Sequence, residues 1–190
     1  MCKIYHYSVL QKNIAISCKS FFQADKVDMM WNKTGRGLLL MTSTEIDSTG
    51  ASYYGKQALH FMNTKGDSFS VQLSKEGPIH AVSWSPKSNE FCVVYGYMPS
   101  KTTLFNLKCD PVFEFGTGPR NSIYYNDFGN ILLLGGFGNL SGNIEVWDVL
   151  KRKEIAKFEA PDSTLLTWNP KGDTFATATT APRLRMSNGY

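Results

Sequence analysis

Four basic residues in one short stretch form the most distinct candidate binding pattern in the sequence. Lys151, Arg152 and Lys153 are consecutive, and Lys157 follows four residues later. Cations held on a rigid edge can neutralise phosphates and give salt-dependent binding, so the stretch is a candidate contact with RNA. A solvated turn between two strands is the alternative interpretation, because turns also collect polar and charged residues.

Five more residues are candidate contacts with RNA or protein. Arg120 follows a Gly-Thr-Gly-Pro segment that suits a loop on the rim of a repeat protein. Arg183 and Arg185 flank one leucine, so both would point to the same face of a strand. Tyr53 and Tyr54 lie in an insertion and could stack on single-stranded nucleic acid. A structural or solvated arginine, and tyrosines packed on their own loop, are the alternatives.

Catalytic and metal-binding patterns are missing from the sequence. The four cysteines are too far apart for a paired-ligand zinc site, and no histidine stands at a companion spacing. The glycine-rich GGFGNLSG lacks the Gly-Lys-Ser/Thr ending of a phosphate-binding loop and links two expected strands. His60 and His80 fall in expected strands without a readable nucleophile and carboxylate. We therefore predict no catalytic residue, no metal, no cofactor and no enzymatic activity.

Composition is typical of a globular protein with a mixed surface. The chain has 190 residues, of which 42% are hydrophobic, and a formal net charge of +4. That charge permits an anionic partner without requiring one. No apolar run approaches the roughly 18 residues of a membrane helix, and the amino-terminal residues lack a secretory pattern. We expect a cytoplasmic protein without a membrane partner.

A pattern of alternating apolar residues, an aromatic residue, a polar turn and a second strand recurs four times. The aromatic positions are Trp31, Trp84, Tyr125 and Trp168, which lie 53, 41 and 43 residues apart. These intervals are close to the roughly 40 to 45 residues of a WD-repeat propeller blade. An insertion in the first repeat accounts for its greater length. Each repeat therefore starts with a β-hairpin.

A third and a fourth strand follow each hairpin, and the Trp147-Asp148 pair ends one of the third strands. A four-stranded sheet cannot bury both faces alone, so such units stack blade on blade. No window keeps the apolar spacing of a helix. We predict an all-β, WD-repeat-type β-propeller of about four blades that forms an arc of a larger ring. The expected segments are the end of one blade at 2–21, blades at about 25–75, 78–116 and 120–160, and an incomplete blade at 163–190.

Several segments resemble the propeller of the eukaryotic translation initiation factor 2A family. The most specific are NLKCDPVF and GTGPRN, and the resemblance spans essentially the whole chain. It implies that the chain matches the later half of an amino-terminal propeller of nine blades, which a carboxy-terminal region follows. No individual binding residue can be transferred from the resemblance.

The resemblance also implies a function. Members bind the small ribosomal subunit and help to bring initiator methionyl-tRNA to it, without hydrolysing GTP themselves. We expect the propeller to contact ribosomal RNA and proteins, and tRNA delivery to belong to the full-length factor. DNA is not an expected partner. The alternative is a general protein-interaction scaffold, for example like the b subunit of initiation factor 3.

Overall fold

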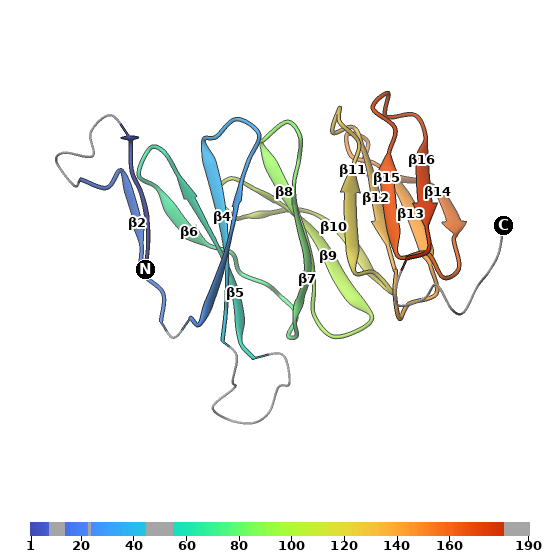
Figure 1. Cartoon of the computed structure of the whole chain (residues 1–190), viewed down its shortest axis with the longest axis horizontal. Helices are drawn as coiled ribbons and strands as arrows, with labels where there is room; N and C mark the ends of the chain where they lie inside the picture. Colours follow the sequence, from blue (N-terminus) through green and yellow to red (C-terminus); the bar gives the residue numbers. More distant parts are fainter. Residues whose placement is uncertain (8–13, 23, 45–54, 181–190) are drawn as a thin grey trace. The chain divides into compact units, whose positions relative to one another are not determined.

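The computed structural model describes residues 1–7, 14–22, 24–44 and 55–180. These residues form sixteen β-strands and contain no α-helix, which confirms the all-β prediction (Figure 1). Every sheet is antiparallel and keeps its strands in sequence order, as a succession of hairpins requires. In the part of the chain that the structure describes, we find no helical segment with the length and hydropathy of a membrane span.

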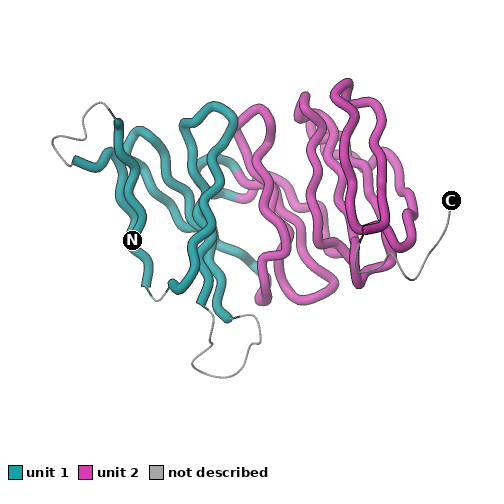
Figure 2. The backbone as a smooth tube through the Cα atoms, viewed as in Figure 1, with its two compact units in different colours: residues 1–74, 106–110 teal, residues 75–105, 111–190 magenta. Residues whose placement is uncertain are grey.

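The chain divides into two compact units (Figure 2). Unit 1 comprises Met1–Ser74 with Asn106–Asp110, and unit 2 comprises Lys75–Phe105 with Pro111–Tyr190.

Unit 1 contains a two-stranded sheet and a four-stranded sheet. Their strands are β1 (Cys2–Ile4), β2 (Ser17–Lys19), β3 (Lys26–Trp31), β4 (Gly37–Ser43), β5 (Gln57–Asn63) and β6 (Ser68–Ser70). Its core is a cluster of Ile4, Leu38, Leu40 and Met62, against which Phe21 packs. Strand β4 lies between β3 and β5 and is buried along most of its length, as its apolar sequence GLLLM indicates.

Unit 2 contains two four-stranded sheets and one two-stranded sheet. The strands are β7 (Ile79–Trp84), β8 (Glu90–Tyr95), β9 (Ser100–Asn106), β10 (Pro111–Gly118), β11 (Ser122–Tyr125), β12 (Ile131–Gly135), β13 (Asn143–Asp148), β14 (Lys153–Glu159), β15 (Leu165–Trp168) and β16 (Phe175–Ala178). Strand β11 packs against β7, β8 and β15, so neighbouring sheets share apolar side chains. One such cluster joins Cys92 and Leu104 to Leu132 and Leu134.

Five hairpin turns each begin with an asparagine that has the same role. Its Oδ1 accepts hydrogen bonds from backbone N–H groups that follow it, as Asn106 does from Lys108 and Asp110 at 2.8 and 3.0 Å. The residue three positions after each asparagine has a positive φ, a conformation that glycine adopts most easily. The asparagines are Asn32, Asn63, Asn106, Asn126 and Asn169, and the positive-φ residues are Gly35, Gly66, Cys109, Gly129 and Gly172. Four of the five turns therefore use glycine, and one uses a cysteine.

The four repeat-defining aromatics each occupy the last position of a first strand. Trp84 makes an edge contact with Phe91, and Trp168 makes one with Phe175. Tyr125 packs against a buried cluster of unit 2, while Trp31 is 49% exposed. The aromatic residue therefore recurs at the end of each first strand, but its burial differs from one sheet to the next.

Candidate functional site

The turn between β13 and β14 carries the basic stretch. Asp148 ends β13, and its Oδ1 accepts a hydrogen bond from the backbone N–H of Lys151 at 2.8 Å. The Lys151 ammonium lies 3.8 Å from the other carboxylate oxygen, and its side chain is 80% exposed. Asp148 of the Trp-Asp pair therefore shapes the turn, while Lys151 extends into solvent.

Arg152 reaches from this turn to the outer strand of the preceding sheet. Its φ is +53°, which turns the chain back into β14. Nη1 donates a hydrogen bond to the Val112 carbonyl at 3.1 Å, and the guanidinium carbon lies 5.8 Å from the centre of the Phe113 ring. A cation over an aromatic face at this distance is attracted to it. Arg152 stays exposed, but its orientation is set by β10.

The two remaining lysines lie along β14. Lys153 is the register partner of Asp148, and within the residues that the structure describes its side chain makes no ion pair. Lys157 pairs in register with Glu145, and its ammonium lies 3.2 Å from Glu154. Four cations and four carboxylates fall between residues 145 and 159. The hairpin therefore presents cations at its tip without a net positive charge, and Lys157 lies away from that tip.

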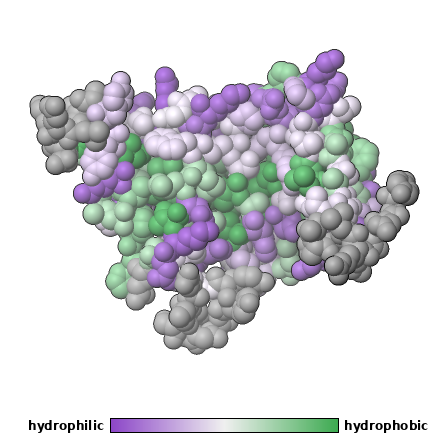
Figure 3. Space-filling view, in the orientation of Figure 1, coloured by the Kyte–Doolittle hydropathy of each residue, from purple (hydrophilic) through white to green (hydrophobic). Residues whose placement is uncertain are grey.

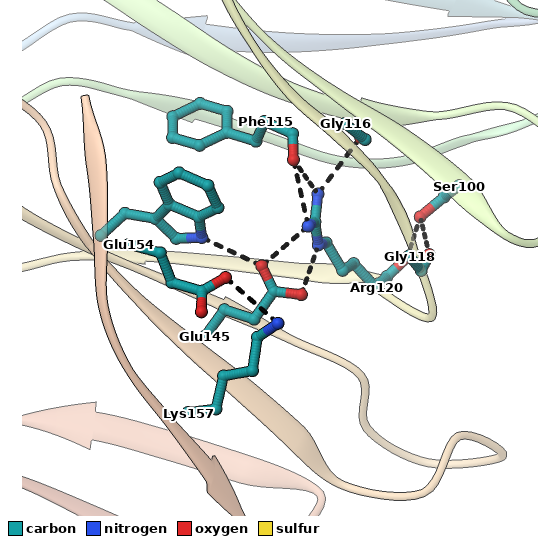
Figure 4. Close-up of polar contacts among 9 residues, drawn as sticks. Ser100, Phe115, Gly116, Gly118, Arg120, Glu145, Glu154 and Lys157 are labelled. Carbon is teal, nitrogen blue, oxygen red and sulfur yellow. Dashed lines mark hydrogen bonds and ion pairs between the residues drawn. The ribbon is translucent and has the colours of Figure 1, made fainter.

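Arg120 is a correction to the expected contacts, because its guanidinium is not available to a ligand. Arg120 is only 5% exposed. Nη2 and Nε donate to the two carboxylate oxygens of Glu145 at 2.7 and 3.1 Å, which is a bidentate ion pair (Figure 4). Nη1 and Nη2 also donate to the Phe115 carbonyl at 3.2 Å. The structural alternative was the right one for this residue.

Glu145 is the centre of this buried network. It also accepts a hydrogen bond from Trp147 Nε1 at 3.0 Å, and the Trp147 ring packs edge-on against Phe113 and Phe115. The network thus connects β13 to the end of β10. A cleft of about 480 Å³ opens beside it, with Pro119, Asn143, Ile144, Glu145, Lys157, Phe158 and Glu159 as its lining. Charges of both signs line the cleft, so it does not select an anion.

The other expected contacts fall outside the described residues. These are Tyr53 and Tyr54 of the insertion, and Arg183 and Arg185 near the carboxyl end of the chain. In the part of the chain that the structure describes, no three His, Cys, Asp or Glu side chains gather in a way that could hold a metal ion.

A second polar cluster, in unit 1, was not found from the sequence. The Oγ of Ser70 lies 3.1 Å from both the Lys19 ammonium and the Nδ1 of His60. Lys19 is 41 residues from His60, so no local spacing indicates the contact. The strand pairing places His60 directly opposite Ser70, and a correct pairing of β5 with β6 would have been the available signal.

The hydrophilic surface of unit 2 includes the edge on which the β15–β16 turn lies, at the top of the view in Figure 3. Exposed apolar side chains occur on the strands of unit 2, at Ile155 and Phe158 of β14 and Leu165 of β15, and also in turns, as at Leu150. Phe158 also meets Phe175 of β16 edge-on, with ring centres 5.9 Å apart.

Comparison with known proteins gives a consistent result. Residues 19–190 match the sequence profile described as "Eukaryotic translation initiation factor eIF2A". The chain is 64% identical over 190 residues to eukaryotic translation initiation factor 2A of Drosophila melanogaster, covering 100% of this chain and 30% of that protein. The corresponding Saccharomyces cerevisiae protein is 37% identical over 182 residues, with 92% and 28% covered. The chain thus spans less than a third of the length of these curated relatives.

Solved structures confirm the fold class. A crystal structure of the eukaryotic initiation factor superposes with a TM-score of 0.81 at 37% identity, covering 95% of this chain and 42% of that one. The carboxy-terminal WD40 domain of Sif2 superposes with a TM-score of 0.59 at 14% identity, covering 87% of this chain and 45% of the other. The predicted WD-repeat-type β-propeller, in partial form, is therefore confirmed.

Proposed function

The chain belongs to the eukaryotic translation initiation factor 2A family, and from that premise we propose that it is a propeller segment that binds the small ribosomal subunit. In the full-length factor, this binding supports delivery of initiator methionyl-tRNA. The contacts are with ribosomal RNA and proteins, so the protein acts in the cytoplasm. The family is one of initiation factors and not a known class of enzymes.

Family membership is the observation that carries this proposal. The basic turn supplies a local reason, because Lys151, Arg152 and Lys153 are exposed at the tip of one rigid hairpin. Asp148 fixes the backbone at Lys151, and β10 limits the motion of the Arg152 guanidinium. A preorganised cation loses less conformational entropy when it meets a phosphate than a free side chain does. The balanced charge of the surrounding hairpin favours a mixed surface of RNA and protein.

Co-sedimentation of the full-length factor with purified small ribosomal subunits tests the proposal. Replacing Lys151, Arg152 and Lys153 together with Ala should weaken binding and flatten its salt dependence. Each lost phosphate contact should reduce the slope of log affinity against log salt by about 0.7 to 0.9. A tRNA-binding assay on the same variant then separates subunit binding from tRNA binding by the complete factor.

A charge-matched control is available in unit 1. Lys33, Arg36 and Lys65 are also exposed residues of hairpin turns, and their replacement by Ala removes the same number of lysines and arginines. If the control variant and the basic-turn variant bind equally, the basic turn is not the contact. If wild-type factor does not co-sediment at all, the proposed function is wrong.

A protein-interaction scaffold remains the second candidate, supported by the exposed apolar side chains of unit 2. Leu150 is 69% exposed beside the basic turn, and Ile155 is 56% exposed on β14. Apolar side chains with polar neighbours are typical of protein interfaces. Binding that survives high salt and is lost in Leu150→Asp, but not in the basic-turn variant, would favour this candidate.

A further inference from the structure

Lys19, His60 and Ser70 come from three different strands and meet at one point of unit 1. The Lys19 ammonium donates a hydrogen bond to Ser70 Oγ at 3.1 Å, and His60 Nδ1 lies 3.1 Å from the same oxygen. Strand β2 contributes the lysine, β5 the histidine and β6 the serine. A cation, an imidazole and a hydroxyl that converge in this way are all groups that can donate hydrogen bonds to a phosphate oxygen.

The imidazole is held in place by packing. Phe21 stacks on His60 with the ring centres 6.0 Å apart and the planes 17° from parallel. Phe21 in turn packs against the buried core cluster of unit 1. His60 is also fixed opposite Ser70 by strand pairing. The site therefore exists before any ligand arrives, which reduces the entropy cost of binding.

The residues at the strand position of His60 have partners inside the protein in unit 2. His60, Thr103 and Glu145 each lie three residues before the first residue of their hairpin turn. Thr103 hydrogen-bonds to the Tyr95 hydroxyl at 3.1 Å, and Glu145 pairs with Arg120. Among the described residues, Lys19 has no carboxylate within ion-pair distance. Within the described part of the chain, the cluster in unit 1 therefore contains a cation that no carboxylate neutralises.

An exposed aromatic ring follows the lysine closely in the chain. Phe22 is 89% exposed, although its neighbour Phe21 is packed against the core. Exposed aromatic rings beside cations serve as stacking platforms for the bases of single strands, whereas a phosphopeptide needs no such ring. The exposed Phe22, three residues after Lys19 in the sequence, therefore favours RNA as the source of the phosphate.

We propose that Lys19, His60 and Ser70 bind a phosphate of single-stranded RNA, with Phe22 stacking on a neighbouring base. The proposal rests on the proposed function, because it identifies a second RNA-binding surface of the same factor. Ser70 Oγ and the Lys19 ammonium contact the phosphate oxygens, and the imidazole contributes a proton donor when it is charged.

The histidine makes binding dependent on pH. Burial first, and the nearby Lys19 charge second, lower the pKa of His60. Lys19 of β2 is the charged group that affects the His60 pKa. The register partners of His60 are uncharged: Leu40 on β4 and Ser70 on β6. A bound phosphate opposes both effects because it stabilises the imidazolium. RNA binding should therefore tighten as pH falls through the pKa of His60, since the phosphodiester stays anionic.

Fluorescence anisotropy of the full-length factor with a labelled oligouridylate of roughly twelve nucleotides tests the site. Lys19→Ala should weaken binding about threefold to tenfold at about 50 mM KCl and reduce the salt slope by about 0.7. Phe22→Ala should weaken binding about tenfold without changing the slope. His60→Gln should remove the difference in affinity between about pH 6 and about pH 7.5. Ser70→Ala, a small change at an exposed position, should also weaken binding.

Lys26→Ala is the matched control, because Lys26 is an exposed lysine of unit 1 that already pairs with Asp28 at 3.1 Å. Equal affinities of Lys19→Ala and Lys26→Ala would overturn the site, as would an unchanged pH dependence in His60→Gln. Lys19-dependent binding of a phosphoserine peptide without binding of the oligouridylate would also overturn it. Subunit co-sedimentation of wild-type factor is scored separately. Its absence contradicts the proposed function, whereas a Lys19-dependent oligouridylate affinity still supports the site.

Discussion

Arg120 and Glu145 form a buried, bidentate ion pair in which Nη2 and Oε2 lie 2.7 Å apart. The pair connects the segment after β10 with the centre of β13, so it links two neighbouring sheets of unit 2. The remaining guanidinium N–H groups are used by backbone carbonyls of β10. A buried charge is tolerated only when its partners are complete, as they are here.

Arg120→Ala should therefore lower the free energy of unfolding by about 3 to 5 kcal/mol, because it leaves the Glu145 carboxylate buried and unpaired. Arg120→Lys should also destabilise the protein, since one ammonium cannot replace the two parallel bonds. Urea unfolding followed by tryptophan fluorescence measures both variants. Lys26→Ala removes an exposed ion pair and should cost less than about 1 kcal/mol. If Arg120→Ala costs no more than that control, the network does not stabilise the fold.

Trp147 offers a separate test of how the sheets pack. Its ring meets Phe115 edge-on with the ring centres 5.1 Å apart, and Nε1 bonds to Glu145. Trp147→Ala should lower the free energy of unfolding by about 3 kcal/mol, at the low end for a large aromatic because the ring is only partly buried.

Trp147→Phe should cost about 1 kcal/mol from the lost hydrogen bond, together with a smaller loss of packing. Thermal melting of both variants gives the comparison. A melting temperature of Trp147→Ala within error of the wild type would contradict the packing of β13 on β10.

Local patterns in the sequence were sufficient for the fold, but not for the pairs that connect distant segments. The position of Trp168 at the end of a first strand follows from alternation and the turn after it. The Arg120 ion pair does not follow from a local pattern. In the sequence, Glu145 has the pattern of an outward-facing strand residue, and only the neighbouring sheet buries it. Lys19 and Ser70 are likewise brought together by sheet packing across 51 residues. Charged pairs between sheets depend on tertiary geometry, which no local period contains.

The turn at Cys109 contains a backbone conformation that suits glycine. Cys109 has φ of +66°, and glycine occupies the same place in the four other asparagine turns. A side chain in this region costs about 1 to 2 kcal/mol. Cys109→Gly should therefore be about 1 kcal/mol more stable than Cys109→Ala, since both variants lose the sulfur and only one keeps Cβ.

Gly35→Ala is the converse change. Gly35 has the same φ of +66°, and a Cβ built there meets nothing within 4 Å, so its expected loss of about 1 kcal/mol comes from the backbone alone. The urea midpoints of Cys109→Gly, Cys109→Ala and Gly35→Ala measure these differences in stability. Equal stability of Cys109→Gly and Cys109→Ala would show that the turn accommodates a side chain without cost.

The buried thiols should make the protein sensitive to alkali. Burial, and then the Asp110 charge, raise the pKa of Cys109 from its ordinary value of 9.0 to about 12. A group whose pKa is raised by folding stabilises the protein fully below its unfolded pKa. That stabilisation is lost as pH rises, here from about pH 9 towards pH 12, because the unfolded chain releases the proton first. Burial also raises the pKa of Cys92, so this thiol likewise lowers the free energy of unfolding as pH rises.

Urea unfolding at about pH 8 and about pH 10 measures this loss. The decrease in the free energy of unfolding between the two pH values should be about 1.4 kcal/mol smaller in Cys109→Ala than in the wild type, because one titrating thiol is gone. The comparison cancels the effect of the substitution on packing, since that effect is present at both pH values. An identical decrease in Cys109→Ala and the wild type would mean that Cys109 ionises in the folded protein as easily as in the unfolded chain.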